Sequence, residues 1–177
     1  MPLRKGKCYS KSDRPPYTRK SRVRTKSYIK GAPQTRISKF MMGDLEGFQD
    51  EKYKCCVELV MDEKVQIRDN ALEASRTLIN KELEKKLKGN YFFVVAAYPH
   101  QILREKKILS GAGADRLSTG MQLAFGKPIG LAARVQEGNS VFRVFCNKNA
   151  INVAKEALKK VKSKIPGKKR IVVRSLK

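Results

Sequence analysis

Acidic residues, histidines and long apolar runs are scarce in this chain of 177 residues. Asp and Glu together number 16 against 40 Lys and Arg, which leaves a formal net charge of +24. The excess is too large to serve solubility alone and favours a polyanionic partner, with nucleic acid ahead of an anionic membrane surface. No apolar run approaches the roughly 20 residues that a spanning helix needs, and we predict no membrane partner.

Residue types that ligate metals or perform catalysis are few and scattered. No CxxC pair occurs among the four cysteines, which are Cys8, Cys55, Cys56 and Cys146. His100 is the single histidine, so the regular ligand spacing of a zinc site is missing, and we expect free thiols in a reducing cytoplasm. Residues 111–115 lack both the Gly-Lys-Ser/Thr of a phosphate-binding loop and the third glycine of a dinucleotide fingerprint. We therefore expect no metal, no cofactor and no enzymatic activity.

The first 40 residues are predicted to be a basic extension rather than part of the core. Asp13 is their only acid, tyrosines and prolines are interleaved with the basic residues, and apolar periodicity is weak. Such a segment repels itself and has little to bury, so its expected role is to bind RNA phosphates and stack tyrosines on bases. A disordered tail without a partner is the alternative. The candidate RNA-binding residues here are Arg4, Lys5, Lys7, Arg14, Tyr17, Arg19, Lys20, Arg22, Arg24, Lys26 and Arg36.

Residues 41–177 are predicted to form a single α+β domain. Alternating or continuous apolar residues predict strands over 53–61, 65–68, 91–98, 129–135, 140–146 and 169–174. Apolar positions at helical spacing predict one helix after Asn70 and a second over 149–164. Each helix has a single apolar stripe, so we expect two helices packed on one face of a mixed, mainly antiparallel sheet, an α/β sandwich. The turn signal at 137–139 predicts that its flanking strands pair as a hairpin.

The first predicted helix carries clear local signals. Asn70 and Glu73 have the spacing of a capping box, and Gly89 supplies a stop. Its buried stripe is expected to contain Leu72, Ser75, Ile79, Leu83 and Lys86/Leu87. Glu82 with Lys86, and Glu84 with Lys88, stand four residues apart and are expected to pair along the helix surface.

The C-terminal helix and strand carry many basic residues. Glu156 is the only acid after Asn149, which favours an RNA-binding face over a merely solvated lysine face. The candidate residues are Lys168, Lys169, Arg170 and Arg174.

A basic, glycine-rich stretch over 98–128, YPHQILREKKILSGAGADRLSTGMQLAFGKP, is the longest predicted connection. Connections of this length in compact domains usually have a function, and we expect a long flexible loop, centred on 101–118, that enters a negatively charged space. An idle surface loop is the alternative. The residues expected to act there are His100, Arg104, Lys106, Lys107, Gly111, Gly113 and Arg116, where arginines bind phosphates and glycines allow close approach.

Several segments resemble one family. RDNALEASRTLINKELEKKL, the stretch over 98–128, AARVQEG and the N-terminal CYSKSDRPPYTRKSRVR are similar to the large-subunit ribosomal protein L-sixteen family, in its archaeal and eukaryotic branch, also called L-ten-e. The resemblance implies a structural protein on large-subunit rRNA in the cytoplasm, with neighbouring ribosomal proteins and tRNA as partners. It places the protein near the aminoacyl-tRNA site and the loop toward the peptidyl transferase centre, with Arg104, Lys106, Lys107 and Arg116 as the probing residues.

Two other hypotheses stay open at this point. One is an RNA-modifying enzyme that uses His100 or Cys146, and the other is a free protein that compacts nucleic acid through charge alone.

Overall fold

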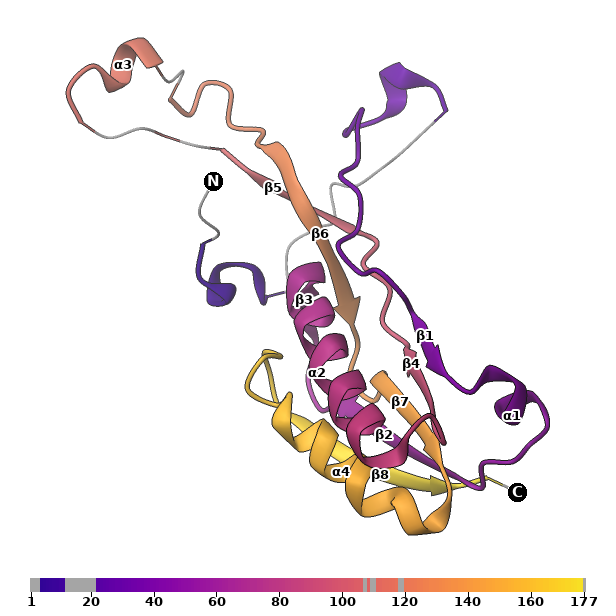
Figure 1. Cartoon of the computed structure of the whole chain (residues 1–177). Coiled ribbons are helices and arrows are strands. Elements are labelled where there is room, and N and C mark those ends of the chain that lie inside the picture. Colours follow the sequence, from indigo (N-terminus) through magenta and orange to yellow (C-terminus); the bar gives the residue numbers. More distant parts are fainter. Residues whose placement is uncertain (1–3, 12–21, 107, 109–110, 118–119, 177) are drawn as a thin grey trace.

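The computed structural model describes residues 4–11, 22–106, 108, 111–117 and 120–176. These residues form two sheets, with two long helices side by side against the larger sheet (Figure 1). The strands are β1 (Met41–Gly43), β2 (Cys55–Met61), β3 (Val65–Arg68), β4 (Phe92–Val95), β5 (Gln101–Glu105), β6 (Lys127–Val135), β7 (Ser140–Cys146) and β8 (Lys169–Ser175). The helices are α1 (Leu45–Gln49), α2 (Asp69–Leu87), α3 (Ala114–Leu117) and α4 (Ile151–Lys160), with 3-10 turns η1 (Gly6–Tyr9), η2 (Arg24–Lys26) and η3 (Lys148–Ala150). The predicted α+β class is confirmed.

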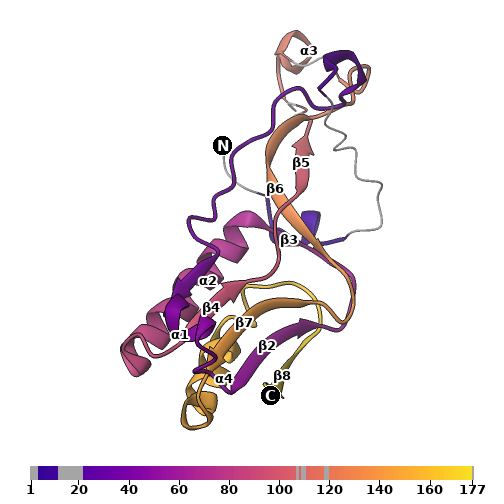
Figure 2. The same ribbon diagram turned by 90° about the vertical axis from the view of Figure 1, so that its right-hand side faces the viewer.

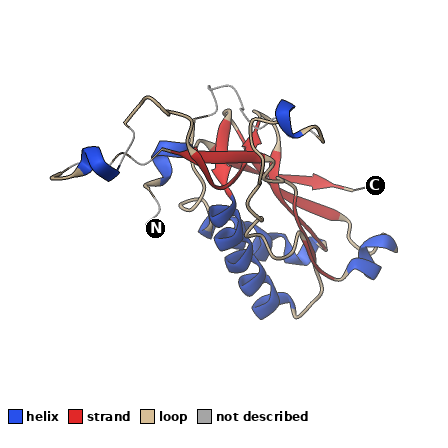
Figure 3. Ribbon diagram, turned by 90° about the horizontal axis from the view of Figure 1, so that it is seen from above, coloured by secondary structure: helices blue, strands red, loops and turns tan. Residues whose placement is uncertain are grey.

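The larger sheet has the strand order β1-β4-β7-β2-β8, and every neighbouring pair in it is antiparallel. The two long helices lie in a layer on one side of the strands when the molecule is viewed from above (Figure 3). Between the layers lies one apolar core, in which Leu59, Phe93 and Phe142 of the sheet meet Leu83 and Leu158 of the two helices. All five side chains are fully buried, so the amphipathic stripe of each helix has the sheet as its partner.

The smaller sheet has the order β3-β6-β5 and is also antiparallel. β5 and β6 extend away from the helical layer as an arm, with α3 beyond their ends (Figure 2). Ile29 of the N-terminal extension packs with Ile102 and Leu131 in a second, small core at the arm, and Ile37 belongs to the main core. Parts of the extension are therefore packed on the domain, and the domain boundary at residue 40 stays a prediction.

The hairpin predicted from β6 and β7 is wrong. β6 pairs with β3 and β5 in the smaller sheet, whereas β7 pairs with β2 and β4 in the larger one. The turn between them is present, but it carries the chain from one sheet to the other. There the N–H of Gly138 donates to the carbonyl of Met61 over 2.8 Å, and the N–H of Met61 donates to Asn139 over 3.0 Å. The turn signal is local, whereas strand partners are set by long-range burial.

Helix α2 begins at Asp69, and the predicted capping box is also wrong. No side chain caps the first turn at the N-cap residue, Arg68. The buried Asp69 carboxylate instead accepts from the N–H groups of Asn70, over 2.8 Å, and Arg36, over 3.3 Å, while Glu73 pairs with Arg76 over 2.6 Å. The helix ends as predicted, with left-handed backbone at Lys88 and Gly89. The buried positions Leu72, Ser75, Ile79 and Leu83 confirm the stripe, Leu87 is partly buried, and Lys86 is exposed.

Apart from the pair of Glu73 with Arg76 within α2, the ion pairs of the described helices run between α2 and α4. Glu82 pairs with Lys160 over 2.8 Å, and Lys86 pairs with Glu156 over 2.5 Å. Glu84 accepts a hydrogen bond from the Tyr91 hydroxyl over 2.9 Å. Glu82 and Glu156 therefore join the two helices to each other, and Glu84 joins α2 to the residue just before β4.

Acid should weaken the helical layer. The hydrogen bond from Lys160 lowers the pKa of Glu82, and the one from Lys86 lowers the pKa of Glu156. A carboxylate whose pKa is lower in the folded state than in the unfolded state stabilises the fold at pH values above its unfolded-state pKa. This stabilisation is lost as the pH falls through the folded-state pKa. We expect the melting temperature to fall below about pH 4.5, the unfolded reference for Glu. Thermal unfolding of Glu82→Gln/Glu156→Gln should show a weaker acid dependence than the unchanged chain, with Glu137→Gln, in an exposed turn, as the control.

Candidate nucleic-acid interface

The stretch predicted as one loop over 98–128 is partly a strand. β5 occupies the first five residues of the predicted loop 101–118 and pairs with β6. The reason is that β6, the central strand of the smaller sheet, has two edges to satisfy, and β5 pairs with one of them. Gly126 fits this pairing because a Cβ there would lie 2.6 Å from the backbone carbon of Glu105. The connection proper begins after Glu105, at the far end of the arm.

Apolar side chains share the far end of the arm with the basic ones. Met121, Leu123 and Phe125 are exposed by 64%, 63% and 51%. The Arg104 guanidinium lies 4.0 Å from the centre of the Phe125 ring, which is a cation–π contact. Charge counting predicted the basic residues here, but it missed this apolar group. Together they give a surface suited to unpaired bases and phosphates.

The described start of the extension docks on β3, an edge strand of the smaller sheet. The N–H of Gln66 donates to the carbonyl of Ser10, and its side-chain amide donates to the carbonyl of Tyr9, each over 2.8 Å. Arg68 donates to the carbonyl of Arg4 over 3.1 Å and lies 5.4 Å from the Tyr9 ring centre. Residues 4–10 are thus fixed against β3 by backbone and side-chain contacts.

The same N-terminal segment reaches the end of β5. The Glu105 carboxylate is bound by the Arg4 guanidinium and accepts from the Tyr9 hydroxyl over 3.1 Å. Glu105 raises the pKa of Arg4, and burial followed by the same carboxylate raises the pKa of Tyr9. One of the few acids of the arm is therefore neutralised from within the chain.

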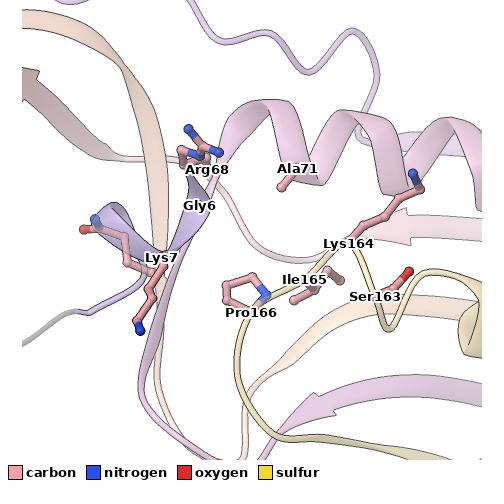
Figure 4. Close-up of a pocket in the computed structure, with 9 residues that line it drawn as sticks. Gly6, Lys7, Arg68, Ala71, Ser163, Lys164, Ile165 and Pro166 are labelled. Carbon is pink, nitrogen blue, oxygen red and sulfur yellow. The ribbon is translucent and has the colours of Figure 1, made fainter. Parts of the chain in front are cut away.

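A cavity of about 220 Å³ lies where this segment meets the body. Ala71, Ile165 and Pro166 give it an apolar lining, and Arg68, Lys7 and Lys164 line it as well (Figure 4). No acidic side chain is among its described lining residues. Three basic residues from separate parts of the chain with no acid between them favour a negatively charged ligand.

The C-terminal basic residues are partly engaged within the protein. Arg170 pairs with Asp62 over 3.3 Å, and Arg174 pairs with Glu58 over 3.4 Å. The Lys169 ammonium donates to the carbonyl of Ile165, and burial followed by the charge of Lys162 lowers the pKa of Lys169. Both arginines remain largely exposed, so their outer edges can meet a partner.

The predicted residues fall into three groups. Exposed residues include Arg4, Lys5, Lys7, Arg22, Lys26, Arg36, His100, Arg116 and Lys168. Half-buried residues are Arg104, Lys106 and Lys169, whereas Arg24 lies in η2, and Gly111 and Gly113 adopt positive φ. Outside the described residues lie Arg14, Tyr17, Arg19, Lys20 and Lys107.

Two basic residues were missed by the prediction. Arg68 lines the cavity in Figure 4, and Arg143 lies on the sheet face opposite the helices, next to Glu58. Lys164, which lines the same cavity as Arg68, is one of the lysines after Asn149 that the basic composition of this segment had singled out. Arg143 could have been found, because it is the one basic residue in the apolar strand SVFRVFC. Arg68 is the last residue of β3, and at the end of an element the periodicity of apolar residues gives no signal.

Catalysis by Cys146 is disfavoured by its surroundings. Its side chain is fully buried, and burial raises its pKa to about 11, so the thiolate that a nucleophile needs is suppressed. The described residues contain no group of three potential metal ligands. No helix among them is both long and apolar enough to cross a bilayer.

Taken together, these features define a strongly basic α+β protein with a two-layer body and a projecting arm. The chain belongs to the ribosomal protein L16p/L10e family, whose model matches residues 12–172. The predicted family is thereby confirmed, and so is the prediction that the chain is not an enzyme, because this is a family of structural ribosomal proteins.

The chain is similar to archaeal proteins along almost its whole length. The large ribosomal subunit protein uL16 of Staphylothermus marinus is 48% identical over 178 residues, which cover 100% of this chain and 97% of that protein. The uL16 protein of Sulfolobus acidocaldarius is 46% identical, with 99% and 96% covered. That of Natronomonas pharaonis is 40% identical, with 89% and 86% covered. The predicted archaeal type of the family is confirmed.

Proposed function

We propose that this chain is a structural constituent of the large ribosomal subunit, in the cytoplasm, where it binds large-subunit rRNA and contacts neighbouring ribosomal proteins. The observation that carries the proposal is the family membership over residues 12–172. The net charge of +24 supports it, because rRNA is a dense polyanion that neutralises such a protein. The cavity lined by Lys7, Arg68 and Lys164 is suited to an rRNA phosphate.

The arm formed by β5 and β6 is the part of the chain that we propose to lie close to tRNA. We place its far end near the aminoacyl-tRNA site and the peptidyl transferase centre, as the family resemblance implies. The arm extends away from the helical layer, so a protein anchored by its body can reach a distant site (Figure 2). In this position the arm would support tRNA binding, and peptidyl transfer itself would be left to RNA.

Sedimentation tests the proposal directly. The chain, expressed with a tag in an archaeal host, should migrate with large subunits in a gradient after a salt wash. Protection of a discrete rRNA segment from cleavage would separate this function from general compaction of nucleic acid. A chain that stays at the top of the gradient, or that protects DNA and RNA alike without a defined site, contradicts the proposal.

Basic residues around the cavity of Figure 4 should account for part of the salt dependence of rRNA binding. Each phosphate contact adds about 0.9 to the slope of log K against log salt on duplex nucleic acid. We expect Lys7→Ala and Lys164→Ala each to lower that slope by about one and to weaken binding across sequences. The matched control is Lys86→Ala, since Lys86 is paired with Glu156 in the helical layer. Equal slopes for all three variants would remove the cavity from the interface.

A further inference from the structure

A second cavity, of about 570 Å³, lies at the junction of the two sheets. The segment after β4 and the residues around the β6–β7 turn form its walls. Its polar and aromatic lining consists of Tyr98, His100, Arg134, Asn139, Ser140 and Arg143. The cavity is thus lined by aromatic rings, arginines and small polar groups. Its apolar lining comes from residues 94–97 and from Ala133 and Val135.

Two rings in this cavity form a platform. The Tyr98 side chain is 48% exposed, and its ring lies 4.4 Å, centre to centre, from the His100 ring. The Tyr98 ring also stacks with the Phe40 ring, with the ring centres 5.1 Å apart and an interplanar angle of 22°. Phe40 is packed against the main core, so the platform is anchored. An exposed, anchored ring is what a nucleobase needs for stacking, at low cost in side-chain entropy.

Arg143 is held in a fixed position beside the platform. Its Nε donates to the Ser140 hydroxyl over 2.8 Å and lies 3.2 Å from the Glu58 carboxylate. Glu58 is buried and is shared with Arg174, so one negative charge orients two guanidinium groups. Neither Nη of Arg143 has a hydrogen-bond partner among the described residues. The outer edge of the guanidinium therefore keeps two donors in the geometry that binds a phosphate.

We propose that this cavity binds one unpaired nucleotide of RNA, with its base on the Tyr98–His100 platform and its phosphate on Arg143. Glu58 and Ser140 act as positioning residues for that arginine. The nucleotide must be unpaired, because a base within a helix has both faces covered by its neighbours. Asn139 and Ser140 offer hydrogen-bonding groups to the base edge or the ribose. The inference rests on the proposed function and assigns it a particular site.

Ultraviolet crosslinking in assembled large subunits tests this site. Subunits that contain the chain are irradiated and digested with nuclease and protease, and nucleotide adducts are located by mass spectrometry. We expect an adduct on the peptide that carries Tyr98 and His100. Arg143→Ala should lower the yield of this adduct about tenfold, since a hydrogen-bonded charged group contributes at least that factor. Arg143→Lys keeps the charge but loses the fork and should restore the yield only partly.

Matched variants separate the site from general binding. Lys86→Ala removes a cation that is also paired with a carboxylate, Glu156, but lies outside the cavity, and should leave the adduct unchanged. Tyr98→Phe keeps the ring and should retain an adduct. Each variant is compared with the unchanged chain for its melting temperature and its share of the gradient's large-subunit peak. Adducts elsewhere on an incorporated chain but none here, or a crosslink from these residues to another protein, would overturn the inference alone. A chain that is absent from large subunits would overturn the proposed function as well.

Discussion

Replacing Phe142 by alanine should lower the free energy of unfolding by about 3–5 kcal/mol, the usual cost of removing a large buried ring. Phe142 is fully buried in β7, the central strand of the larger sheet, and its ring lies 5.8 Å from that of Phe93. The cavity left by truncation would lie between strands and helices that are fixed by other contacts, so collapse would fill little of it. Domains of this size are stable by only about 5–15 kcal/mol, so a large share of the stability would be lost.

Denaturant unfolding of the free protein measures this loss. Phe125→Ala is the matched control, because it removes the same side chain from an exposed position at the end of the arm. We expect its unfolding midpoint to stay within experimental error of the unchanged chain. Similar destabilisation by the two substitutions would show that the arm and the body share one core.

Shortening the far end of the arm should separate stability from function. Replacing residues 106–126 by a two-residue turn leaves β5, β6 and both cores in place, because these elements end at Glu105 and begin again at Lys127. We expect the melting temperature and the incorporation into large subunits to be nearly unchanged. Translation by these subunits should be strongly impaired, with slow tRNA accommodation or incomplete subunit maturation.

The measurements are melting of the free protein, the large-subunit peak in a gradient, and peptide synthesis by purified subunits. Phe125→Ala serves here as the mild variant, since it removes only the ring beneath Arg104. A marked loss of thermal stability on shortening would show that the segment contributes to the core. Full activity of the shortened chain would contradict a role of the arm at the tRNA site.

Most elements could be predicted because their signals are local. The apolar stripe of α2 and the apolar strands β2, β4 and β7 are visible as patterns in the sequence, and they were found within a few residues of their ends. The partition into two sheets could not be predicted, because it depends on which distant strands meet. The turn before Ser140 has the same residues whether or not its flanking strands pair. They do not pair here, because β3 and β5 occupy both edges of β6 while β2 and β4 occupy both edges of β7.

The residue types of the candidate interface could be predicted from the sequence, but the contacts that these residues make within the chain could not. Charge counting selected residues such as Lys5 and Lys168, whose side chains are exposed in the structure. It could not show that Arg4 binds Glu105 or that Arg174 binds Glu58, because these contacts join residues far apart in sequence. It also passed over Tyr98, whose exposure follows from the bend of the chain between the two sheets.

The contacts of residues 4–10 have a consequence for the chain while it is being synthesised. Residues 4–10 find their partners on β3 and at Glu105, so they leave the ribosome that makes them long before those partners exist. Contacts over such separations need the closure of a long loop before they contribute. Until β3 and the end of β5 have been made, the basic residues of this segment have none of these partners, and their positive charge is not held against the domain.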